Sequence, residues 1–446
     1  MAAVAALMLG LSVAAPAHAV APVGPVTANP PDGIPQLGTS GTDGSIEQVR
    51  QLVPCGANMY AVGKFSSLKR FTTLYPRNNA ASFSATTGVM TTWDPNVNGQ
   101  VDTIAFDAAD TTCSYAYLGG TFTSVGGTAV KNIAKVSTTT GLVDTTFKNI
   151  VGGRVAHMEV MQGHLLVGGY FPASASPAAP GYFKSVSPTT GLPDGYGLPA
   201  ISGNYVFTGV KANPTRVYNM EPSPIGNAVL VMGDFTSVGG LARRQIFRLN
   251  LGATSATVSN WYSVGNPNSP IVKNGFNEDC ATVEPYWLQA AAWSPDASKI
   301  YIATTGYRPW RQKDTTKPRT ELCDAAAAFP ATEANVDPLW VNYPGCDSLF
   351  SAAADASTVY IGGHERWANN PNGCDKAGSG AIAAPGMAGL DSTTGLLSFN
   401  PTRARGLGAD DMTLTPAGLW VASDNQGNAA MCAGKFGHSG ICFLPY

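Results

Sequence analysis

Short apolar runs followed by glycine-rich turns recur along almost the whole chain. The run Tyr115–Leu118 leads into "GGTFTSVGGT", and closely similar stretches are "YAVGKFSSL" at residue 60 and "LVMGDFTSVGGLAR" at residue 230. Short apolar runs bounded by turn residues are typical of buried strands. The pattern therefore predicts a β protein built from copies of one unit.

The repeat can be measured from one position, the residue that ends each apolar run, which we call the marker residue. The markers are Gly63, Gly120, Gly169, Gly233, Thr304, Gly363 and Ser423. Successive markers are 57, 49, 64, 71, 59 and 60 residues apart. The spacing predicts seven units of about sixty residues.

A second motif follows four of the markers and contains another glycine. It reads "ATTGVMTTW" at residue 85, "TTTGLVDTTF" at 138, "PTTGLPDGY" at 188 and "STTGLLSF" at 392. We expect Gly88, Gly141, Gly191 and Gly395 to adopt the positive φ of a tight hairpin between the last two strands of a unit. The aromatic residues after these turns should pack between neighbouring units: Trp93, Phe147, Tyr196, Trp261, Trp340 and Phe399.

Four strands per unit would form a small antiparallel sheet that cannot bury both of its faces alone. Closing seven such sheets into a ring buries every face, so the sequence predicts an all-β, seven-bladed β-propeller with four-stranded blades. A single domain would span residues 20–446. After Trp420 the last unit has room for one more strand, "GICFLPY". We therefore expect the N-terminal segment around residues 34–39 to supply its fourth strand and close the ring.

The segments "LGGTFTSVGGT" and "NIAKVSTTTGLVDTTF" resemble the delta-60 repeat of secreted bacterial β-propellers. The likeness is good in units 1, 2 and 4 and partial in unit 3, so it covers about half of the chain. The resemblance implies a propeller fold and little specific chemistry. The architecture is also similar to that of propeller-lectin subunits of exported bacterial toxin particles.

The composition restricts the class of partner. Charged residues make up 13% of the chain and the net charge is -2, which leaves no basic field for nucleic acid. The opening "MAAVAALMLGLSVAAPAHA" ends in Ala17 and Ala19 around His18, the pattern of a secretory signal peptide over residues 1–19. No later segment is apolar enough to span a bilayer. We expect a secreted, extracellular protein.

Eight cysteines in an exported chain predict disulfides. Cys280 and Cys346 open the first strands of units 5 and 6, while Cys323 and Cys374 lie in the long second-to-third-strand loops of the same units. We expect bridges from Cys280 to Cys323 and from Cys346 to Cys374. Cys55 and Cys113 hold matching places in units 1 and 2 and should tie them together. Cys432 and Cys442 would form a local bridge.

The same two loops break the repeat pattern and are therefore candidates for a binding site: "GYRPWRQKDTTKPRTELC" at 306 and "GHERWANNPNGC" at 363. Each contains a Trp and an Arg just past the marker, a combination that suits the faces and hydroxyls of a sugar and equally suits a peptide. The alternative is that the rings only roof the blade. The candidate ligand-binding residues are Tyr307, Arg308, Trp310, Arg311, His364, Glu365, Arg366, Trp367, Asn369 and Asn370.

Signals of catalysis and of metal or cofactor binding are missing from the sequence. The histidines His157, His164, His364 and His438 have no metal-ligand spacing, and His157 and His164 are expected to line strands. The acid pairs Glu278–Asp279 and Asp410–Asp411 are expected at solvated loop edges, with a calcium or catalytic carboxylate site as the alternative. No catalytic residue, metal or cofactor is predicted.

Three function classes remain. The first is a non-catalytic, lectin-like module for cell-surface or cell-wall glycans. The second is a docking subunit that binds a partner protein in a secreted complex. The third is a glycan hydrolase or lyase.

Overall fold

The protein is described by a computed structural model over residues 24–38, 46–171, 181–204, 214–278, 280, 287–307, 319–401, 403, 405–406, 408–425 and 438–446. Strands dominate these residues, and the helical element among them is the short 3-10 helix η2 (Gly275–Asn277). No helix in the described part of the chain is long and apolar enough to cross a bilayer. The predicted signal peptide, residues 1–19, lies outside the described residues.

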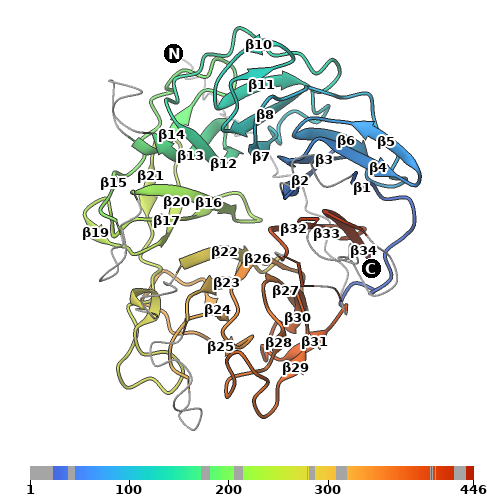
Figure 1. Ribbon diagram of the computed structural model, residues 1–446. Helices are drawn as coiled ribbons and strands as arrows, with labels where there is room; N and C mark the ends of the chain where they lie inside the picture. The colour runs from blue at the N-terminus through green and yellow to red at the C-terminus, as the bar shows by residue number, and fades with distance from the viewer. Residues whose placement is uncertain are drawn as a thin grey trace, which may run out of the picture.

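The strands form small antiparallel sheets that surround a common centre (Figure 1). The innermost strands are β2 (Gln48–Cys55), β7 (Val101–Ala105), β12 (Arg154–Met161), β16 (Arg216–Pro222), β22 (Trp287–Trp293), β26 (Leu349–Ala354) and β32 (Asp411–Thr415). Each contacts the next, and β32 contacts β2. This radial arrangement of antiparallel sheets is that of a β-propeller.

The second strand of each sheet ends within two residues of the marker residue and is almost wholly buried. These strands are β3 (Asn58–Lys64), β8 (Tyr115–Gly120), β13 (His164–Phe171), β17 (Ala228–Asp234), β23 (Lys299–Thr305), β27 (Thr358–Gly363) and β33 (Gly418–Ala422). Both neighbouring strands and the adjacent sheets cover them, which explains why the sequence shows continuous apolar runs there rather than an alternating pattern.

The third strands are β6 (Ala80–Ser84), β11 (Ile133–Ser137), β14 (Gly181–Val186), β20 (Ile246–Leu251), β24 (Ala326–Pro330), β30 (Met387–Asp391) and β34 (Ile441–Pro445). A fourth strand follows in three of these sheets, as β21 (Ala256–Val258), β25 (Trp340–Asn342) and β31 (Leu397–Phe399). In three others, single bridges stand in its place: Phe83 to Met90, Val136 to Val143, and Val186 to Pro193. The predicted four-stranded sheet is therefore complete in only part of the ring.

Small hairpins between the second and third strands account for the length of the unit. They are β4 (Ser67–Arg70) with β5 (Thr73–Pro76), β9 (Ser124–Val125) with β10 (Thr128–Ala129), β18 (Ser237–Val238) with β19 (Leu241–Ala242), and β28 (Trp367–Ala368) with β29 (Ile382–Ala383). In the second of these, Gly126 and Gly127 form the turn with φ of +56° and +80°. The later glycine pair of "GGTFTSVGGT" is therefore explained by turn geometry.

Where the marker residue is glycine, it is required for a different reason. A Cβ built on Gly63 would lie 2.1 Å from the backbone oxygen of Gln48, and one on Gly120 would lie 2.2 Å from that of Gln100. The innermost strand bulges at this point and its backbone occupies the space of a side chain. The run of glycines after a strand thus combines a crowded bulge with a tight turn.

Aromatic side chains lock neighbouring sheets together, as the sequence predicted. The indole N–H of Trp93 donates to the carbonyl of Ser137 at 3.1 Å, in the next unit along the chain. Trp261 donates in the same way to Pro330 and Trp340 to Ser392. The turn glycines before these aromatic residues have the expected positive φ, between +68° and +73° at Gly88, Gly141, Gly191 and Gly395.

The N-terminal segment and the last strand lie side by side, although not in the predicted pairing. The backbone N–H of Thr27 donates to Pro445 at 2.7 Å, and that of Leu37 donates to Ser439 at 2.8 Å. The strand β1 (Gln36–Leu37) pairs with β4 of the first hairpin, and in the described residues the sheet β32-β33-β34 has no fourth strand. In the described part of residues 34–39, a regular strand of the last sheet is not seen, because Gln36 pairs with Lys69 and Leu37 with Leu68.

Three disulfides join the cysteine pairs expected from the sequence: Cys55 to Cys113, Cys280 to Cys323 and Cys346 to Cys374. Cys442 is also disulfide-bonded. Its predicted partner, Cys432, lies outside the described residues.

Candidate functional site

Six of the seven innermost strands have a bulge that presents two successive side chains to the centre of the ring. In β2 the pairing with β3 shifts between Val49 and Gln51, so Arg50 has no partner opposite it. The burial pattern places Val49 and Leu52 in the core, with Arg50 and Gln51 between them partly exposed. In a regular strand, one of these two side chains would point into the core between the sheets. The bulge turns that side chain toward the centre of the ring instead.

The same shift occurs in β7, β12, β16, β22 and β26. All the bulged residues line one cavity of about 780 Å³ at the centre, which we call the mouth cavity: Arg50, Asp102, Ala156, Tyr218, Gln289 and Phe350. A repeated backbone feature therefore builds this cavity, while its side chains differ from strand to strand.

Charged groups are paired around the mouth cavity. Arg154 forms a fork on Asp102, with Nε to Oδ2 at 2.9 Å and Nη2 to Oδ1 at 2.8 Å. Gln100 donates to Asp102 Oδ1 at 2.5 Å. The side chain of Arg154 is 45% exposed, while that of Asp102 is only 4% exposed. The fork thus holds a guanidinium in a fixed, solvent-accessible position.

Aromatic side chains lie between these polar groups. Tyr170, Tyr218, Trp287 and Phe350 all line the mouth cavity. Tyr170 is 38% exposed. The hydroxyl of Tyr218 donates to the carbonyl of Leu288 at 2.5 Å, which fixes its ring between β16 and β22. The cavity therefore offers apolar ring surface beside hydrogen-bonding groups.

Two carboxylates line the mouth from the start of β32. Gln48 donates to Asp410, and the backbone N–H of Leu52 donates to Asp411 at 3.1 Å. Burial raises the pKa of Asp410 to about 7 and that of Asp411 to about 6. Both groups therefore change charge near neutral pH.

The sequence-based expectation for this acid pair was wrong. Asp411 begins β32 and Asp410 precedes it. Both residues line the mouth cavity rather than a solvated loop edge. Glu278 is 2% exposed, so it is buried too. Asp279 lies outside the described residues. His157 in β12 and His164 in β13 line strands, as expected.

Of the predicted ligand-binding residues, His364 reaches the mouth cavity. Its ring packs edge-on against Phe350 with centroids 4.9 Å apart. Burial, with a contribution from Arg405, lowers the pKa of His364. The imidazole is therefore neutral at pH 7.

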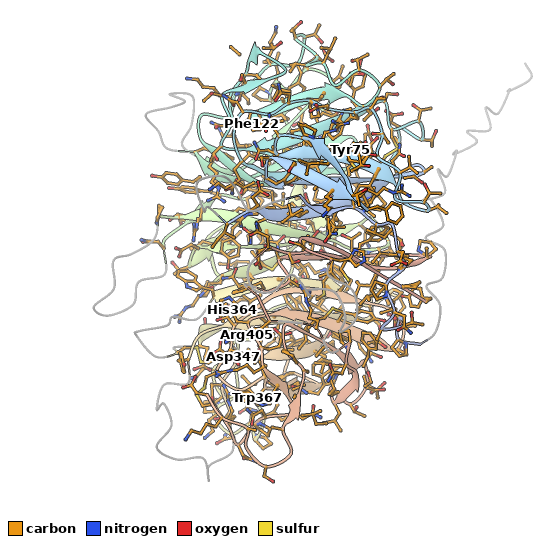
Figure 2. All side chains as sticks on the ribbon, turned by 45° about the vertical axis from the view of Figure 1, so that its right-hand side comes forward. Tyr75, Phe122, Asp347, His364, Trp367 and Arg405 are labelled. Carbon is orange, nitrogen blue, oxygen red and sulfur yellow. A yellow bond between two sulfur atoms is a disulfide. The ribbon has the colours of Figure 1, made fainter. Side chains whose placement is uncertain are left out.

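Trp367 lies further out on the same loop (Figure 2), and Arg366 precedes it in the chain. Arg366 forms a fork on Asp347 with two side-chain bonds of 2.8 Å, and Arg405 adds a further bond to that carboxylate at 3.0 Å. The guanidinium of Arg366 lies 4.6 Å from the ring centroid of Trp367. Both side chains are partly exposed and rigidly held.

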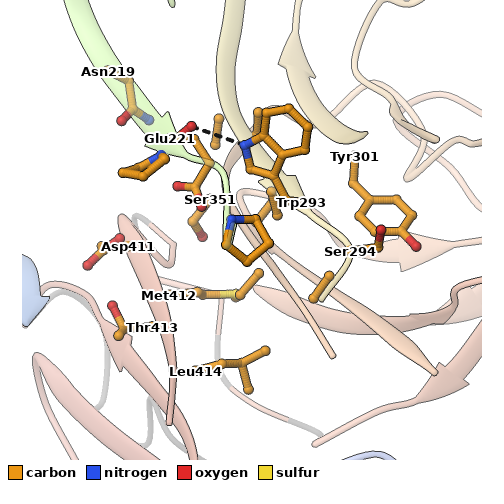
Figure 3. Close-up of a pocket in the computed structure, with 18 of the residues that line it drawn as sticks. Asn219, Glu221, Trp293, Ser294, Tyr301, Ser351, Asp411, Met412, Thr413 and Leu414 are labelled. Carbon is orange, nitrogen blue, oxygen red and sulfur yellow. Dashed lines mark hydrogen bonds between the residues drawn. The ribbon is translucent and has the colours of Figure 1, made fainter. Parts of the chain in front are cut away.

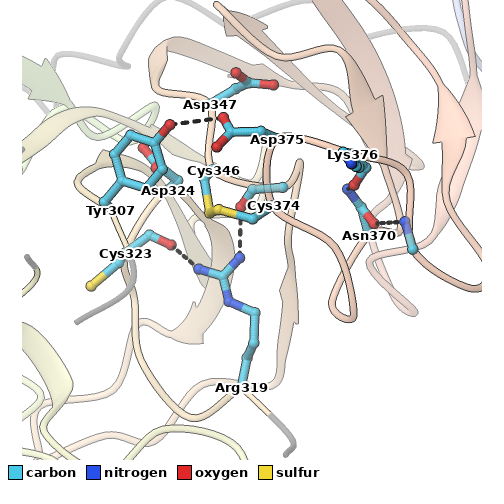
Figure 4. The surroundings of a disulfide bond; sticks show 12 residues. Tyr307, Arg319, Cys323, Asp324, Cys346, Asp347, Asn370, Cys374, Asp375 and Lys376 are labelled. Atoms are coloured by element: carbon cyan, nitrogen blue, oxygen red, sulfur yellow. Dashed lines mark hydrogen bonds between the residues drawn. A yellow bond between two sulfur atoms is a disulfide. The ribbon is translucent and has the colours of Figure 1, made fainter. Parts of the chain in front are cut away.

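Three of the predicted residues are buried. The hydroxyl of Tyr307 donates to Asp375 at 2.8 Å beside the Cys346–Cys374 bridge (Figure 4). Asn370 is fully buried, where it accepts from the N–H of Gly378 at 2.8 Å. These two residues hold the loops of units 5 and 6 in shape.

Asn369 also contributes to the loop scaffold, because it accepts from Asn342 at 2.6 Å and has a positive φ of 54°. Arg308, Trp310 and Arg311 lie outside the described residues.

Glu365, the third buried residue, is 0% exposed and neither carboxylate oxygen has a hydrogen-bond partner in the described residues. Burial raises its pKa to about 8, and the nearby Arg403, 2% exposed, has its pKa lowered to about 10 by its own burial. The corresponding position after the marker is a buried Phe in units 1 to 4: Phe65, Phe122, Phe171 and Phe235. In unit 6 a buried Glu365 beside a buried Arg403 thus takes the place of apolar packing.

Arg319 supports the unit 5 loop and was not singled out from the sequence. Its buried guanidinium donates to Glu321 at 2.8 Å and to the carbonyls of Gly345 and Cys323, each at 2.6 Å (Figure 4). Nothing in its local sequence distinguishes it from a solvated loop arginine.

The described residues contain no group of three or more His, Cys, Asp or Glu side chains arranged to hold a metal ion. No family model and no curated protein matches the chain.

Solved structures do match. One titled "Structure of U3-55K" has a TM-score of 0.46 and 10% identity, covering 95% of this chain and 100% of that one. "Crystal structure of RRP9 WD40 repeats" has a TM-score of 0.47 and 9% identity, covering 94% and 99%. Hydrazine synthase from Kuenenia stuttgartiensis has a TM-score of 0.45 and 12% identity, covering 80% and 90%. Similarity at this level gives no information about ligands or partners.

Proposed function

We propose that the protein is a non-catalytic, lectin-like binding module that recognises glycans of a cell surface or cell wall at the mouth cavity. The observation that carries this proposal is the shared bulge, which brings the ring of Tyr218 and the polar groups of Arg50 and Gln289 into one cavity. Sugars are bound by aromatic faces against their C–H groups and by fixed polar groups on their hydroxyls.

The polar groups are already oriented for this task. The fork between Arg154 and Asp102 positions guanidinium N–H groups, and Gln48 and Gln51 add amides to the lining. Ordered donors and acceptors reduce the entropy lost when a ligand binds. Tyr170 provides the exposed ring nearest to solvent.

The outer edge of the proposed site is the unit 6 loop. His364 lines the mouth cavity, and Arg366 and Trp367 continue the loop outward with partly exposed side chains. We include these three residues in the binding surface, together with Arg308, Trp310 and Arg311 of the unit 5 loop. Asn369 is assigned to the supporting scaffold, with Tyr307, Glu365 and Asn370.

We further propose that one seven-bladed propeller spans residues 20–446, that its N-terminal segment closes the ring, and that it belongs among secreted delta-60 repeat proteins. The cyclic contacts of the innermost strands support the blade number. The hydrogen bonds from Thr27 and Leu37 to the last unit support closure at the termini. The disulfides support an oxidising, extracellular setting, such as a subunit of an exported toxin particle.

A hydrolase or lyase is less well supported. Most glycosidases hydrolyse the glycosidic bond with two carboxylates that flank it. Asp410 and Asp411 are adjacent in the chain, and hydrogen bonds from Gln48 and Leu52 hold them. Release of reducing ends by the purified protein, lost on Asp411→Asn, would overturn the non-catalytic assignment.

A glycan array probed with the full chain tests the main proposal. Tyr170→Ala should weaken binding at least tenfold, because the variant loses ring surface at the mouth cavity. The matched control is Leu142→Ala, which removes a side chain that is 64% exposed on an outer turn. Failure of the wild-type protein to bind any array glycan would contradict the proposal.

Protein docking is the second candidate, and a separate observation favours it. Equivalent outer turns expose apolar side chains that a soluble monomer has no need to place there: Val89, Leu142, Leu192 and Leu396, with exposures between 45% and 64%. Changing all four to Ser should abolish recovery of a stoichiometric partner from the native secreted material. Unchanged recovery would exclude this surface.

A further inference from the structure

The channel at the centre of the ring consists of two cavities, the mouth cavity and a second one of about 780 Å³, which we call the inner pocket (Figure 3). Gln51, His157, Asn219 and Asp411 line both cavities, so a ligand can extend from one into the other. The charged groups along this channel decide which glycans the proposed site accepts. The inference below names a ligand class for that site and therefore rests on the proposed function.

Three arginines line the mouth cavity: Arg50, Arg154 and Arg216. Arg154 and Arg216 are the first residues of β12 and β16, neighbouring strands that contact each other. Arg50 stands at the bulge of β2. No lysine lines this cavity within the described residues. Every lining side chain described there that keeps a positive charge at all physiological pH values is thus a guanidinium.

Arg216 has hydrogen-bond donors that no described group of the protein uses. Its guanidinium forms no hydrogen bond or ion pair in the described part of the chain, and its Nε is buried without a partner. Asp234 stands opposite Arg216 in the strand pair, but no ion pair joins the two. The ring of Tyr218, with its centroid 5.7 Å from the guanidinium carbon, gives only a cation–π contact. A buried N–H group without an acceptor is costly unless a ligand supplies one.

Arg50 also keeps its donors free. Its Nε is buried without a partner, and its guanidinium forms no hydrogen bond within the described residues. Burial raises the pKa of Asp410 and the charge of Arg50 opposes that rise, yet Asp410 takes its hydrogen bond from Gln48. Asp102 is held by Arg154. These mouth carboxylates are therefore engaged by other donors, while two guanidinium groups have no acceptor.

The inner pocket has the opposite lining. The carboxyl groups of Glu159, Glu221 and Asp411 line it, and Figure 3 shows Glu221 and Asp411 on its wall. No arginine lines this pocket among the residues that the structure describes. The Nζ of Lys299 donates to the carbonyl of Ser392 at 3.3 Å. An acidic group on a ligand therefore finds its donors at the mouth, and an uncharged part of the ligand suits the inner pocket better.

We propose that the channel selects acidic glycans, in which a sugar carboxylate binds the guanidinium of Arg216 at the mouth cavity. Two parallel N–H groups of an arginine match the two oxygens of a carboxylate, and such charged hydrogen bonds are about twice as strong as neutral ones. Arg154 and Arg50 add positive charge around the same cavity, and the rings of Tyr170 and Tyr218 offer surface to the sugar. A neutral sugar leaves the guanidinium groups without a charged acceptor.

The test starts from a glycan array with neutral, carboxylated and sulfated sugars, probed with the full chain at pH 7. Carboxylated glycans should bind about tenfold more tightly than neutral glycans of the same backbone. Calorimetry then compares the tightest carboxylated glycan with its methyl ester, which keeps the backbone and removes the charge. The ester should bind about tenfold less tightly.

Variants assign the preference to particular side chains. Arg216→Gln should lower the affinity for the acidic form about tenfold and leave the affinity for the methyl ester unchanged. Arg50→Gln should give a smaller loss in the same direction, because Asp410 partly balances its charge. Lys131→Gln is the control, since it removes an exposed positive charge outside both cavities and should change neither affinity.

The outcomes separate the two proposals. Equal affinities for acid and ester, or an array in which only neutral or sulfated glycans bind, would overturn carboxylate selection and leave glycan binding in place. Binding of no array glycan would overturn the proposed function and this inference with it. Unchanged binding of the acidic form by Arg216→Gln protein, with the melting temperature of the wild type, would overturn the assignment to this guanidinium.

Discussion

The guanidinium of Arg154 forms a two-point hydrogen-bonded fork with the carboxylate of Asp102, which links β12 to the bulge of β7 at the edge of the mouth cavity. The fork is planar and partly exposed, so it fixes the direction of the remaining guanidinium N–H groups. A lysine at this position would keep the charge and lose the geometry.

Arg154→Lys should therefore weaken glycan binding about tenfold, or about 1.4 kcal/mol, with little change in thermal stability because the arginine is largely solvated. Calorimetric titration with the tightest array glycan measures the effect. Lys131→Arg, an exposed change outside both cavities, serves as the control. Equal affinities for the wild type and Arg154→Lys would remove this arginine from the site.

Glu365 should make the protein less stable as pH rises. Its pKa is raised to about 8 in the folded state, above the ordinary value of 4.5, so the folded state holds a proton that the unfolded state has released. Stability is then fully present below about pH 4.5 and is lost as pH rises towards 8, with a slope of up to about 1.4 kcal/mol per pH unit.

Glu365→Gln should flatten this dependence, which urea unfolding between pH 5 and 8 can measure. Asp410 and Asp411 contribute a similar loss at lower pH, since their pKa values are raised to about 7 and 6. The difference between wild type and variant cancels their contribution, so it reports on Glu365 between pH 5 and 8. A constant difference across that range would mean that Glu365 is already ionised.

A side chain at a marker glycine should be destabilising. In Gly63→Ala the new Cβ would meet the backbone oxygen of Gln48 at 2.1 Å, and neither strand can move without disturbing the bulge. We expect a loss of about 2 to 4 kcal/mol in the free energy of unfolding. Gly181→Ala is the control, because the nearest atom there is the flexible Cε of Lys184 at 3.2 Å. Similar losses in both variants would contradict the crowding argument.

The Cys55–Cys113 bridge should stabilise the folded protein, because it lowers the conformational entropy of the unfolded chain. It closes a loop with a sequence separation of 58 between the first two units. The chain-entropy model gives about 4 kcal/mol for a loop of that length. Replacing both cysteines by Ala should lower the unfolding midpoint in urea, and glycan affinity should not change, because neither cysteine lines the channel. An unaltered midpoint would show that the bridge adds nothing to the folded ring.

Features that depend on local backbone geometry could be predicted from the sequence. Gly141 has the expected positive φ, and Trp93 bonds to the next unit, because the tight turn and the aromatic after it recur with the repeat. The pairs Cys280–Cys323 and Cys346–Cys374 followed from the same positions in successive units.

The lining of the mouth cavity was not predicted, because apolar and polar residues do not alternate along the strands that form it. Val49 and Leu52 in β2, like Val217 and Met220 in β16, are apolar positions three residues apart. That spacing resembles neither a regular strand nor a long helix. The signal that could have identified the lining is that this spacing of two apolar residues recurs before the marker residues. Two residues outside the core lie between the apolar positions.

The loop predictions depended on residues far apart in the chain. Glu365 was expected at a binding surface, but its position next to Arg403 is set by packing between units. Tyr307 was expected to face a ligand, and Asp375 takes its hydroxyl instead. Local sequence carries no information about such contacts.

The bulge also separates two demands on the same strand. Core residues such as Val155 and Met158 hold the sheets together, while Ala156 and Gln289 sit at bulges and line the mouth cavity. Each bulge thus offers one position at the cavity that can be substituted on its own. New ligand preferences can therefore evolve around the mouth cavity by single substitutions at these positions, while the core residues that hold the sheets together stay unchanged.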